Sequence, residues 1–248
     1  MKEKLLNDLE CFNDPEFKFD SKYHKYTYYG DKFESVTRFI QQFHEPFDQE
    51  YWSKKKADET GVPQDWILNE WKKLNDHANQ VGTDTHQWIE DYFNQKWSQI
   101  PTNLDVIHRI NKFNKVYATH LHKLEPLKFE TRIFSKKWKI AGMIDSLFIY
   151  NNKLVILDWK TNKVWTDDTT QSGRFEKLLP PFNDFYKNHL NDYSLQISMY
   201  SLILREWGFN VAGGYLVHIG PGDEDAKLHR CVDMTEKLEK FLNKEVDL

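Results

Sequence analysis

Helical periodicity dominates the first half of the chain. From Val81 to Trp97, apolar residues recur every three to four positions, which predicts an amphipathic helix. A second such pattern follows Pro101, and residues 46–80 have a helical pattern that is interrupted near "GVPQD". Residues 16–34 alternate aromatic and polar side chains around a glycine and predict a small hairpin. Ser35 is then a suitable N-cap for a short helix.

From about residue 125 onward, the pattern changes to the period of two that is typical of β-strands. Asn151–Asn152 lies between two apolar runs and predicts a tight hairpin turn. Segment 164–192 has no clear period and is long for a connector, so we expect a functional loop or lid. Tyr193–Trp207 predicts a helix that Gly208 ends. The segments predicted as strands are 127–135, two within 139–163, 210–220 and 227–234. A last helix is predicted over 235–246.

This order of elements predicts an α/β fold. No linker, repeat or low-complexity tract divides the sequence, so we expect one domain over residues 1–248. Within it, residues 1–124 are expected to form a mostly helical part that carries the small hairpin. Residues 125–248 are expected to form the sheet core that holds the catalytic residues and the helix around residues 196–200.

The composition is that of a folded globular chain. Hydrophobic residues make up 40% and aromatic residues 15%, and a formal charge of -4 argues against a histone-like coat without excluding nucleic acid as a partner. The two cysteines, Cys11 and Cys231, form no CxxC pair and are too few for a four-cysteine iron–sulfur cluster. We find no phosphate loop, signal peptide or membrane-spanning run. Few cysteines and no signal peptide predict a cytoplasmic protein, of a bacterium or a virus-infected host cell.

Asp158 and Lys160 in "LDWKTNK" stand two apart at the end of an apolar run, so on a strand they share a face. Pairing around the two-residue turn places residues whose numbers sum to about 303 opposite one another, which brings Asp145 beside Asp158. Adjacent carboxylates repel unless a cation lies between them, and Mg²⁺ suits such ligands. On this hypothesis, Lys160 holds a water molecule or offsets charge on a phosphate.

An ordinary interpretation of the same residues is also open. An acid and a base two apart on a strand usually form a solvated pair that contributes little to stability. The apolar residues around both acids favour the first interpretation, because charges on buried strands are rarely without a partner. These apolar residues are Met143, Ile144, Leu147, Phe148, Val155, Ile156 and Leu157.

Four short motifs occur in order along the chain. They are G-x-x-x-H at Gly82–His86, G-x-x-D at Gly142–Asp145, D-x-K at Asp158–Lys160 and Q-x-x-x-Y at Gln196–Tyr200. This order resembles the PD-(D/E)XK nuclease superfamily and, within it, the RecB-like exonuclease branch. The layout is similar to that of the mitochondrial genome maintenance exonucleases and their viral and bacterial relatives. The resemblance implies a restriction-endonuclease-like core, with helices flanking a central mixed sheet and an elaborated helical N-terminal half.

The resemblance also implies a role for each matching residue. A Mg²⁺ or Mn²⁺ ion is bound by His86, Asp145, Asp158, the carbonyl of Trp159 and, in some relatives, a strand acid that Glu130 matches. Lys160 positions the attacking water or contacts the phosphate. Gln196 and Tyr200, four apart on one helical face, orient Lys160 or the DNA backbone. No iron–sulfur cluster is expected, because the chain lacks the cysteines.

Structural roles are the alternative for several of these residues. A histidine on a helix is often structural, although the G-x-x-x-H context favours His86 as a ligand. Gln196 and Tyr200 also fit as interior polar residues that backbone groups satisfy. Glu90, one turn after His86, fits equally well as a supporting partner of the site or as a solvated charge.

Segment 164–192 combines aromatic rings with cations, the chemistry that binds single-stranded nucleic acid. Arg174 is predicted to contact the substrate together with Gln196 and Tyr200. Lys163 either contacts DNA or is a solvated charge. A surface lid of ordinary composition has much the same residues. The aromatic and basic residues of this segment include Trp165, Arg174, Phe175, Lys177, Phe182 and Phe185.

The sequence thus predicts a Mg²⁺- or Mn²⁺-dependent DNA exonuclease. It is expected to act on single-stranded DNA ends in replication, recombination or repair, with a replication or recombination protein as a partner and without a membrane. Two alternatives remain open at this point. One is a structure-specific or flap endonuclease that uses the same site, and the other is a non-catalytic nucleic-acid-binding module of recombination whose acids are structural.

Overall fold

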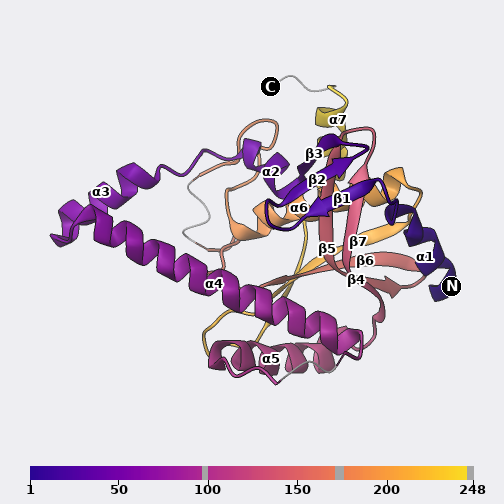
Figure 1. Cartoon of the computed structure of the whole chain (residues 1–248), viewed down its shortest axis with the longest axis horizontal. Helices are drawn as coiled ribbons and strands as arrows, with labels where there is room; N and C mark the ends of the chain where they lie inside the picture. The colour runs from indigo at the N-terminus through magenta and orange to yellow at the C-terminus, as the bar shows by residue number, and fades with distance from the viewer. Residues whose placement is uncertain (97–99, 171–175, 245–248) are drawn as a thin grey trace.

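A mixed β-sheet forms the centre of the computed structural model, which describes residues 1–96, 100–170 and 176–244 (Figure 1). Its strands are β1 (Phe17–Asp20), β2 (Lys25–Tyr28), β3 (Asp31–Ser35), β4 (Glu125–Ser135), β5 (Ile140–Tyr150), β6 (Lys153–Lys160), β7 (Val211–His218) and β8 (Lys227–Arg230). The α-helices of the described residues are α1 (Lys2–Leu9), α2 (Val36–Ile40), α3 (Gln49–Thr60), α4 (Gln64–Phe93), α5 (Leu104–Val116), α6 (His189–Glu206) and α7 (Thr235–Leu242). The predicted α/β class with a central mixed sheet flanked by helices is therefore confirmed.

Strand β5 organises the sheet. Along one edge it pairs antiparallel with β4. Along the other edge it pairs with two different strands, parallel with β3 at Ile140 and Ala141 and antiparallel with β6 from Ser146 to Tyr150. Residues 142–145 lie between these two pairings, so the sheet opens at this point. Beyond β6, the sheet continues with β7, parallel to β6, and then with antiparallel β8.

Two hydrophobic cores cover the two faces of the sheet. Residues of α1, α2, α6 and α7 pack in one core, and residues of α4 and α5 pack in the other. Along β6, Leu154 and Ile156 belong to the first core, whereas Val155, Leu157 and Trp159 belong to the second. Because side chains alternate along a strand, Asp158 and Lys160 lie on the face that α6 covers.

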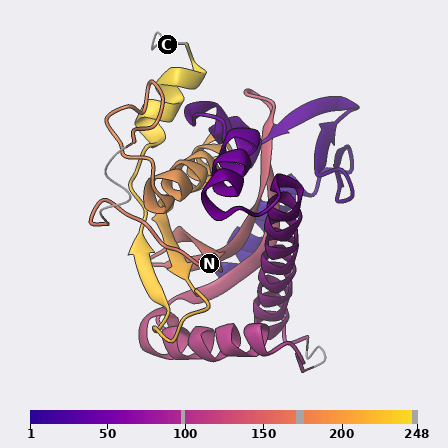
Figure 2. The same cartoon turned by 90° about the vertical axis from the view of Figure 1, so that its left-hand side faces the viewer.

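The long helix α4 departs from the prediction. Its 30 residues include both the end of the predicted segment 46–80 and most of the predicted helix Val81–Trp97, so the boundary at residue 81 is wrong. The interruption lies earlier, where Gly61 adopts the left-handed conformation after α3 and Pro63 precedes α4. Trp97 lies outside the described residues. In Figures 1 and 2, α3 and the first half of α4 extend away from the sheet, while the second half of α4 packs on α5.

The N-terminal β element is larger than the hairpin predicted over residues 16–34. It is a three-stranded antiparallel meander of β1, β2 and β3, because a second turn at Tyr29–Gly30 with positive φ reverses the chain again. The third strand joins the main sheet through β5. The predicted N-cap is confirmed, since the Ser35 hydroxyl accepts a hydrogen bond from the backbone N–H of Arg38 at the start of α2.

The later elements follow the prediction with shifted ends. Asn151 and Asn152 both have positive φ and form the tight turn between β5 and β6, with Tyr150 opposite Lys153 as the residue sum requires. Helix α6 begins at His189 rather than Tyr193, so the last residues of the predicted loop 164–192 are helical. Strand β8 is limited to Lys227–Arg230 and does not extend to residue 234. Among the described residues, none of the helices combines the length and the apolar character needed to cross a bilayer.

Candidate metal centre

Three carboxylates lie side by side on strands β4, β5 and β6. Ser146 pairs with Leu157, so the next rung places Asp145 opposite Asp158. On the other edge, the pairs Phe129–Ser146 and Thr131–Ile144 place Glu130 opposite Asp145. Side chains directly opposite one another on adjacent strands point to the same face, so the three acids form a row across the sheet.

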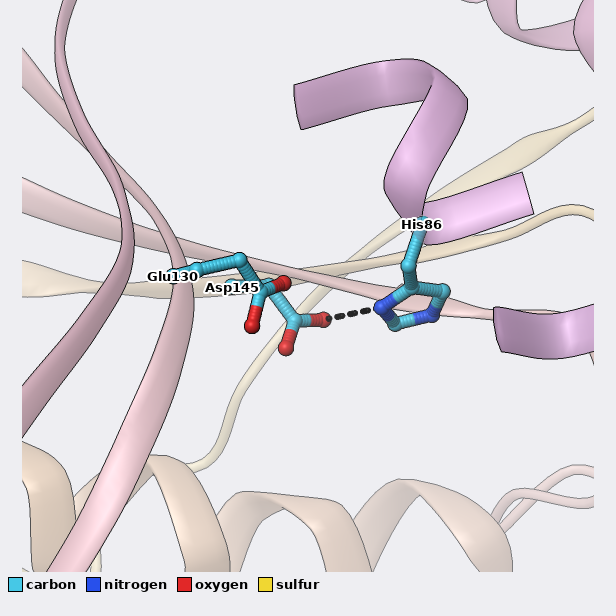
Figure 3. Close-up of side chains that lie close together, drawn as sticks. All are labelled: His86, Glu130 and Asp145. Atoms are coloured by element: carbon cyan, nitrogen blue, oxygen red, sulfur yellow. Dashed lines mark ion pairs between the residues drawn. The ribbon is translucent and has the colours of Figure 1, made fainter. Parts of the chain in front are cut away.

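Helix α4 adds an imidazole to this row. His86 Nδ1 lies 3.4 Å from Asp145 Oδ2, and one ligand atom each of His86, Glu130 and Asp145 lie within 4.8 Å of one another. Figure 3 shows the His86 ring directed at the Asp145 carboxylate, with the Glu130 carboxylate beside it. The three side chains line a cavity of about 360 Å³.

Gly82 allows α4 to approach the sheet at this point. A Cβ atom at Gly82 would lie 3.1 Å from Thr161 Oγ1, just after the end of β6. Since residues four apart on a helix lie on one face, Gly82 and His86 both face the sheet. Packing therefore explains the spacing of the "GTDTH" motif. Gly82 allows α4 to lie close to the sheet, and His86, one turn later, reaches Asp145.

Asp158 and Lys160 form a buried ion pair next to the cavity. Lys160 Nζ lies 2.6 Å from Asp158 Oδ2, and the Asp158 residue is only 2% exposed. The orientation of the two groups leaves Asp158 Oδ2 without a well-aligned hydrogen-bond donor among the described residues. Burial, and then the charge of Asp145, raise the pKa of Asp158 to about 6. Burial acts to lower the pKa of Lys160, but the carboxylates of Asp158 and Asp145 outweigh it and the pKa is raised overall.

Helix α6 holds Lys160 through a short chain of hydrogen bonds. Lys160 Nζ donates to Gln196 Oε1 at 3.2 Å, and Gln196 Nε2 donates to Tyr200 Oη at 2.9 Å. Tyr200 occupies the opening of the sheet, where a Cβ on Gly142 would lie 2.6 Å from its Cε1 atom. The structure thus brings the predicted residues Asp158, Lys160, Gln196 and Tyr200 together. Gln196 and Tyr200 were predicted to orient either Lys160 or the DNA backbone, and in the structure they lie beside Lys160.

Tyr193 is a member of this group that the sequence analysis missed. The Lys160 ammonium lies over the Tyr193 ring, 4.0 Å from its centroid. A cation over an aromatic face is stabilised by the ring quadrupole, more so where water is excluded. Tyr193 stands one turn of α6 before Gln196, and that spacing is the signal that could have identified it.

The backbone of Trp159 points toward the row of acids. Its N–H donates to Asp145 Oδ2 at 3.0 Å, whereas the carbonyl of the next residue, Lys160, accepts from Ile219 N–H on the β7 side. The N–H and C=O of one strand residue point the same way, so the Trp159 carbonyl is directed to the side of Asp145. Its indole is buried on the other face and donates to Ser146 Oγ at 2.8 Å.

Glu130 is the most perturbed acid of the row. Burial raises its pKa to about 8, and the charges of Asp145, Glu90 and Asp158 add to the effect. Its backbone has φ +45, a left-handed conformation that is uncommon for a residue with a side chain. Strain of this kind is concentrated at functional sites. Glu90 lines the same cavity, one turn after His86.

The donor set fits a divalent cation. Carboxylate and carbonyl oxygens are the ligands that Mg²⁺ and Mn²⁺ prefer, and one imidazole is compatible with Mn²⁺ in particular. The three acids of the row have one ammonium beside them, that of Lys160, and burial together with mutual repulsion raises the pKa values of Glu130 and Asp158, so the row favours an added cation. The residues that could hold the ion are His86, Glu130, Asp145, Asp158 and the carbonyl of Trp159.

For the residues of segment 163–192 that were predicted to contact substrate, the structure gives less support than for the acid row. Lys163 is exposed and has no ion pair with any residue that the structure describes. Arg174 and Phe175 lie outside the described residues. Phe182 is fully buried against Phe43, so its expected role in base stacking is wrong. Trp165 stacks on His229 with ring centroids 4.1 Å apart.

Comparisons with known proteins do not assign the chain to a family. No family model matches it, and neither does any curated protein. A solved structure from Eubacterium rectale with the name "Putative exonuclease" is 12% identical over 87% of this chain and 83% of that chain, with a TM-score of 0.44. The solved structure of SSO0001 is 13% identical over 68% of this chain and 71% of that chain, with a TM-score of 0.26. Likenesses this weak assign no activity, so any function has to be argued from the site itself.

Proposed function

We propose that this chain is a metal-dependent nuclease of the PD-(D/E)XK type that hydrolyses phosphodiester bonds in DNA. The observation that carries the proposal is the row of Glu130, Asp145 and Asp158 on three adjacent strands, with Lys160 ion-paired at its end. Acids in a row with one lysine beside them suit the hydrolysis of a phosphodiester, which requires a cation, a positioned water and a group that offsets developing charge.

The metal ligands are His86, Glu130, Asp145, Asp158 and the Trp159 carbonyl, and the ion is Mg²⁺ or Mn²⁺. When bound, the ion supplies polarisation of the scissile phosphate and lowers the pKa of a coordinated water. Lys160 donates a hydrogen bond to the attacking water or to a phosphate oxygen, because its ammonium is held at the edge of the acid row.

Gln196, Tyr200 and Tyr193 act as positioning residues for Lys160. Gln196 accepts a hydrogen bond from the ammonium, Tyr200 fixes the Gln196 amide by accepting from it, and the Tyr193 ring contacts the ammonium from one side. Because its ammonium contacts Asp158, Gln196 and Tyr193, Lys160 loses little conformational entropy in the transition state. Burial raises the pKa of Tyr200 well above its usual value, so its hydroxyl keeps its proton at neutral pH.

The substrate is DNA, and we propose exonucleolytic cleavage from single-stranded ends. Lys163, Trp165 and Lys177 lie in the segment between β6 and α6, so this segment carries both cations and a ring, and the first two follow closely after the end of β6. Single-stranded nucleic acid is bound by this combination. A replication or recombination protein is the partner that we propose for such an activity.

The test is a time course on end-labelled single- and double-stranded DNA of both polarities, in Mn²⁺ or Mg²⁺ and in EDTA. Cleavage is expected only with the metal. Lys160→Met is expected to lower the rate constant about 100- to 1,000-fold, since one aligned donor to developing charge is worth about that much. Lys153→Met, at the other end of β6, is the matched control and should cleave like wild type.

Two outcomes contradict parts of the proposal. Equal cleavage by Lys160→Met and wild type in the presence of the metal rules out the catalytic assignment. Degradation of circular single-stranded DNA shows an endonuclease, because a strict exonuclease leaves a circle intact. Binding of Mn²⁺ and a native circular dichroism spectrum in Lys160→Met separate a catalytic defect from a folding defect.

A further inference from the structure

A second cavity, of about 720 Å³, lies where the β1–β3 meander meets the start of β5. It has twice the volume of the cavity at the acid row. We call it the basic cavity. Its lining consists of Tyr23, His24, Lys25, Lys32, Phe33, Glu34, Ser35, Arg38, Phe39, Trp138, Lys139, Ile140 and Leu242.

The charge of the basic cavity is opposite to that of the whole chain. Four of its lining residues are cations, Lys25, Lys32, Arg38 and Lys139, and one is an acid. The chain as a whole carries a formal charge of -4, and the cavity at the acid row is lined by three carboxylates. A concave surface of one sign focuses the field and attracts the opposite charge, so this cavity favours an anion.

Two of these cations are available to a ligand. Lys25 and Lys32 form no ion pair with any described residue, whereas Lys139 is paired with Asp31 at 2.8 Å. The register pairs Lys32 with Thr27, two residues after Lys25 on the same strand, so both lysines lie on one face of the meander. Phosphates along one strand are the kind of ligand that such a row of ammonium groups suits.

Aromatic side chains accompany the cations. Tyr23 is 68% exposed and Trp138 is half-buried, whereas the lining residues Phe33 and Phe39 are buried in the core. The indole Nε1 of Trp138 is buried and has no hydrogen-bond partner among the described residues. Rings that stack on bases and cations that bind phosphates are the two components of a single-strand binding surface.

The basic cavity is connected to the acid row by shared elements. Ile140 begins β5 directly after Lys139, and Asp145 follows five residues after Ile140 on that strand, about 17 Å away at the usual rise. Val36, directly after the lining residue Ser35, packs toward Gly142 beside Tyr200. A single strand therefore needs only a few nucleotides to reach from one place to the other.

We propose that the basic cavity is a second nucleic-acid-binding site, which binds the phosphates and bases of a single strand a few nucleotides from the cleaved bond. This inference rests on the proposed function for the identity of the strand. It assigns Lys25, Lys32 and the exposed ring of Tyr23 to affinity for long substrates and gives them no part in the chemical step.

The experiment measures binding of a fluorescein-labelled single-stranded oligodeoxynucleotide to the full chain in EDTA, by anisotropy at several salt concentrations. Lys25→Glu/Lys32→Glu is expected to bind at least about 10-fold more weakly. Its slope of log affinity against log salt should fall by about 1.4, since each phosphate contact on a single strand contributes about 0.7. The milder Lys25→Gln/Lys32→Gln variant should shift in the same direction and covers the case that charge reversal impairs folding.

A matched double variant distinguishes a site from a general charge effect. Lys123→Glu/Lys153→Glu carries the same charge change on two exposed lysines outside the cavity and is expected to bind like wild type. Equal losses in both double variants, or an unchanged salt slope in the cavity variants, overturn the proposal. Unchanged binding of the strand together with weaker binding of poly-glutamate also overturns it and indicates an acidic protein segment as the ligand.

A second readout separates this inference from the proposed function. Hydrolysis of bis(p-nitrophenyl) phosphate with Mn²⁺ requires the acid row. This molecule is too small to contact the acid row and the basic cavity at the same time. The cavity variants are expected to keep the wild-type rate on this substrate and to show a raised KM on long single strands. A chain that binds the strand through the cavity and hydrolyses no diester contradicts the proposed function and leaves the binding site in place.

Discussion

At the scale of single residues, strand register sets the chemistry of the acid row. Asp145 lies between Glu130 and Asp158, so each of its neighbours is close to a negative charge in a place where water is scarce. The pKa of Glu130 is raised to about 8 and that of Asp158 to about 6. Burial is the largest cause of both shifts, and the charge of Asp145 is the second largest. A bound cation has the opposite effect, because it favours the ionised form of every ligand.

Metal affinity should therefore depend on pH through Glu130. Below its pKa of about 8 the metal-free chain holds a proton on this carboxyl, and a cation that binds there must displace it. The Mn²⁺ dissociation constant is expected to fall as pH rises toward about 8 and to level off above it. Titration calorimetry at several pH values measures this dependence.

Glu130→Gln provides the comparison. This variant has no proton to displace at position 130, so its affinity is expected to level off near pH 6, the pKa of Asp158. Its affinity at high pH should be lower than that of wild type because one anionic ligand is lost. The same steep rise between about pH 6 and 8 in both proteins would mean that Glu130 does not bind the ion.

The sequence predicted those site residues that local rules bring together. Asp145 and Asp158 follow from the turn and the residue sum, and Gln196 and Tyr200 follow from helical spacing. Glu130 came only from the resemblance, since nothing local pairs β4 with β5 in a given register. Tyr193 was missed because an aromatic residue at helical spacing is also the pattern of a core.

At the scale of elements, glycines set the distances between helices and the sheet. The sequence places Gly82 at the second position of a predicted helix that begins at Val81, although glycine is a poor helix former. In the structure it lies inside α4, where its lack of a side chain allows the contact with Thr161. The Asn151–Asn152 turn was predicted correctly because its geometry depends on two adjacent residues, whereas that of Gly82 depends on a strand about 80 positions away.

Gly142→Ala tests how closely α6 must approach β5. The new Cβ would lie 2.6 Å from Tyr200 Cε1 and 3.1 Å from Val36 Cγ2, so the ring has to move. Overpacking of this kind costs about 1–3 kcal/mol of unfolding free energy. Because Tyr200 is bonded to Gln196, which holds Lys160, we also expect a lower kcat with little change in metal affinity.

Denaturant unfolding and steady-state kinetics measure the two effects. Gly222→Ala is the control, since no atom lies within 4 Å of its added Cβ and its φ is not in the left-handed region. It should change neither stability nor kcat appreciably. A Gly142→Ala protein with wild-type kcat would show that the position of Tyr200 is not important for the reaction.

At the scale of the whole molecule, non-local pairing decides the features that the sequence could not predict. The meander joins β5 through two residues of β3, about 100 positions before them in the chain. The basic cavity is lined by residues from the meander, α2, the start of β5 and α7. None of these segments has a strong basic pattern of its own, so only the folded chain reveals the cavity.

The effect of metal on global stability joins the site to the fold. A ligand that binds only the folded state at about 100 times its dissociation constant stabilises it by about 2.7 kcal/mol. For a chain of this size, that raises the Tm by about 5–11 °C. Wild type is expected to show this shift between EDTA and Mn²⁺ in a thermal scan. Asp225→Asn, which removes an exposed acid remote from the row, should show it too.

Asp145→Asn should have effects of opposite sign in the two conditions. Without metal, the variant is expected to melt above wild type at neutral pH, because the charge that helps to hold the pKa values of Glu130 and Asp158 above their ordinary values is gone, while an amide oxygen still accepts from Trp159 N–H. With Mn²⁺, the shift should disappear, because the acid between the other two ligands is lost. A variant that melts below wild type in EDTA and still gains stability from Mn²⁺ would show that Asp145 is structural and that the ion binds elsewhere.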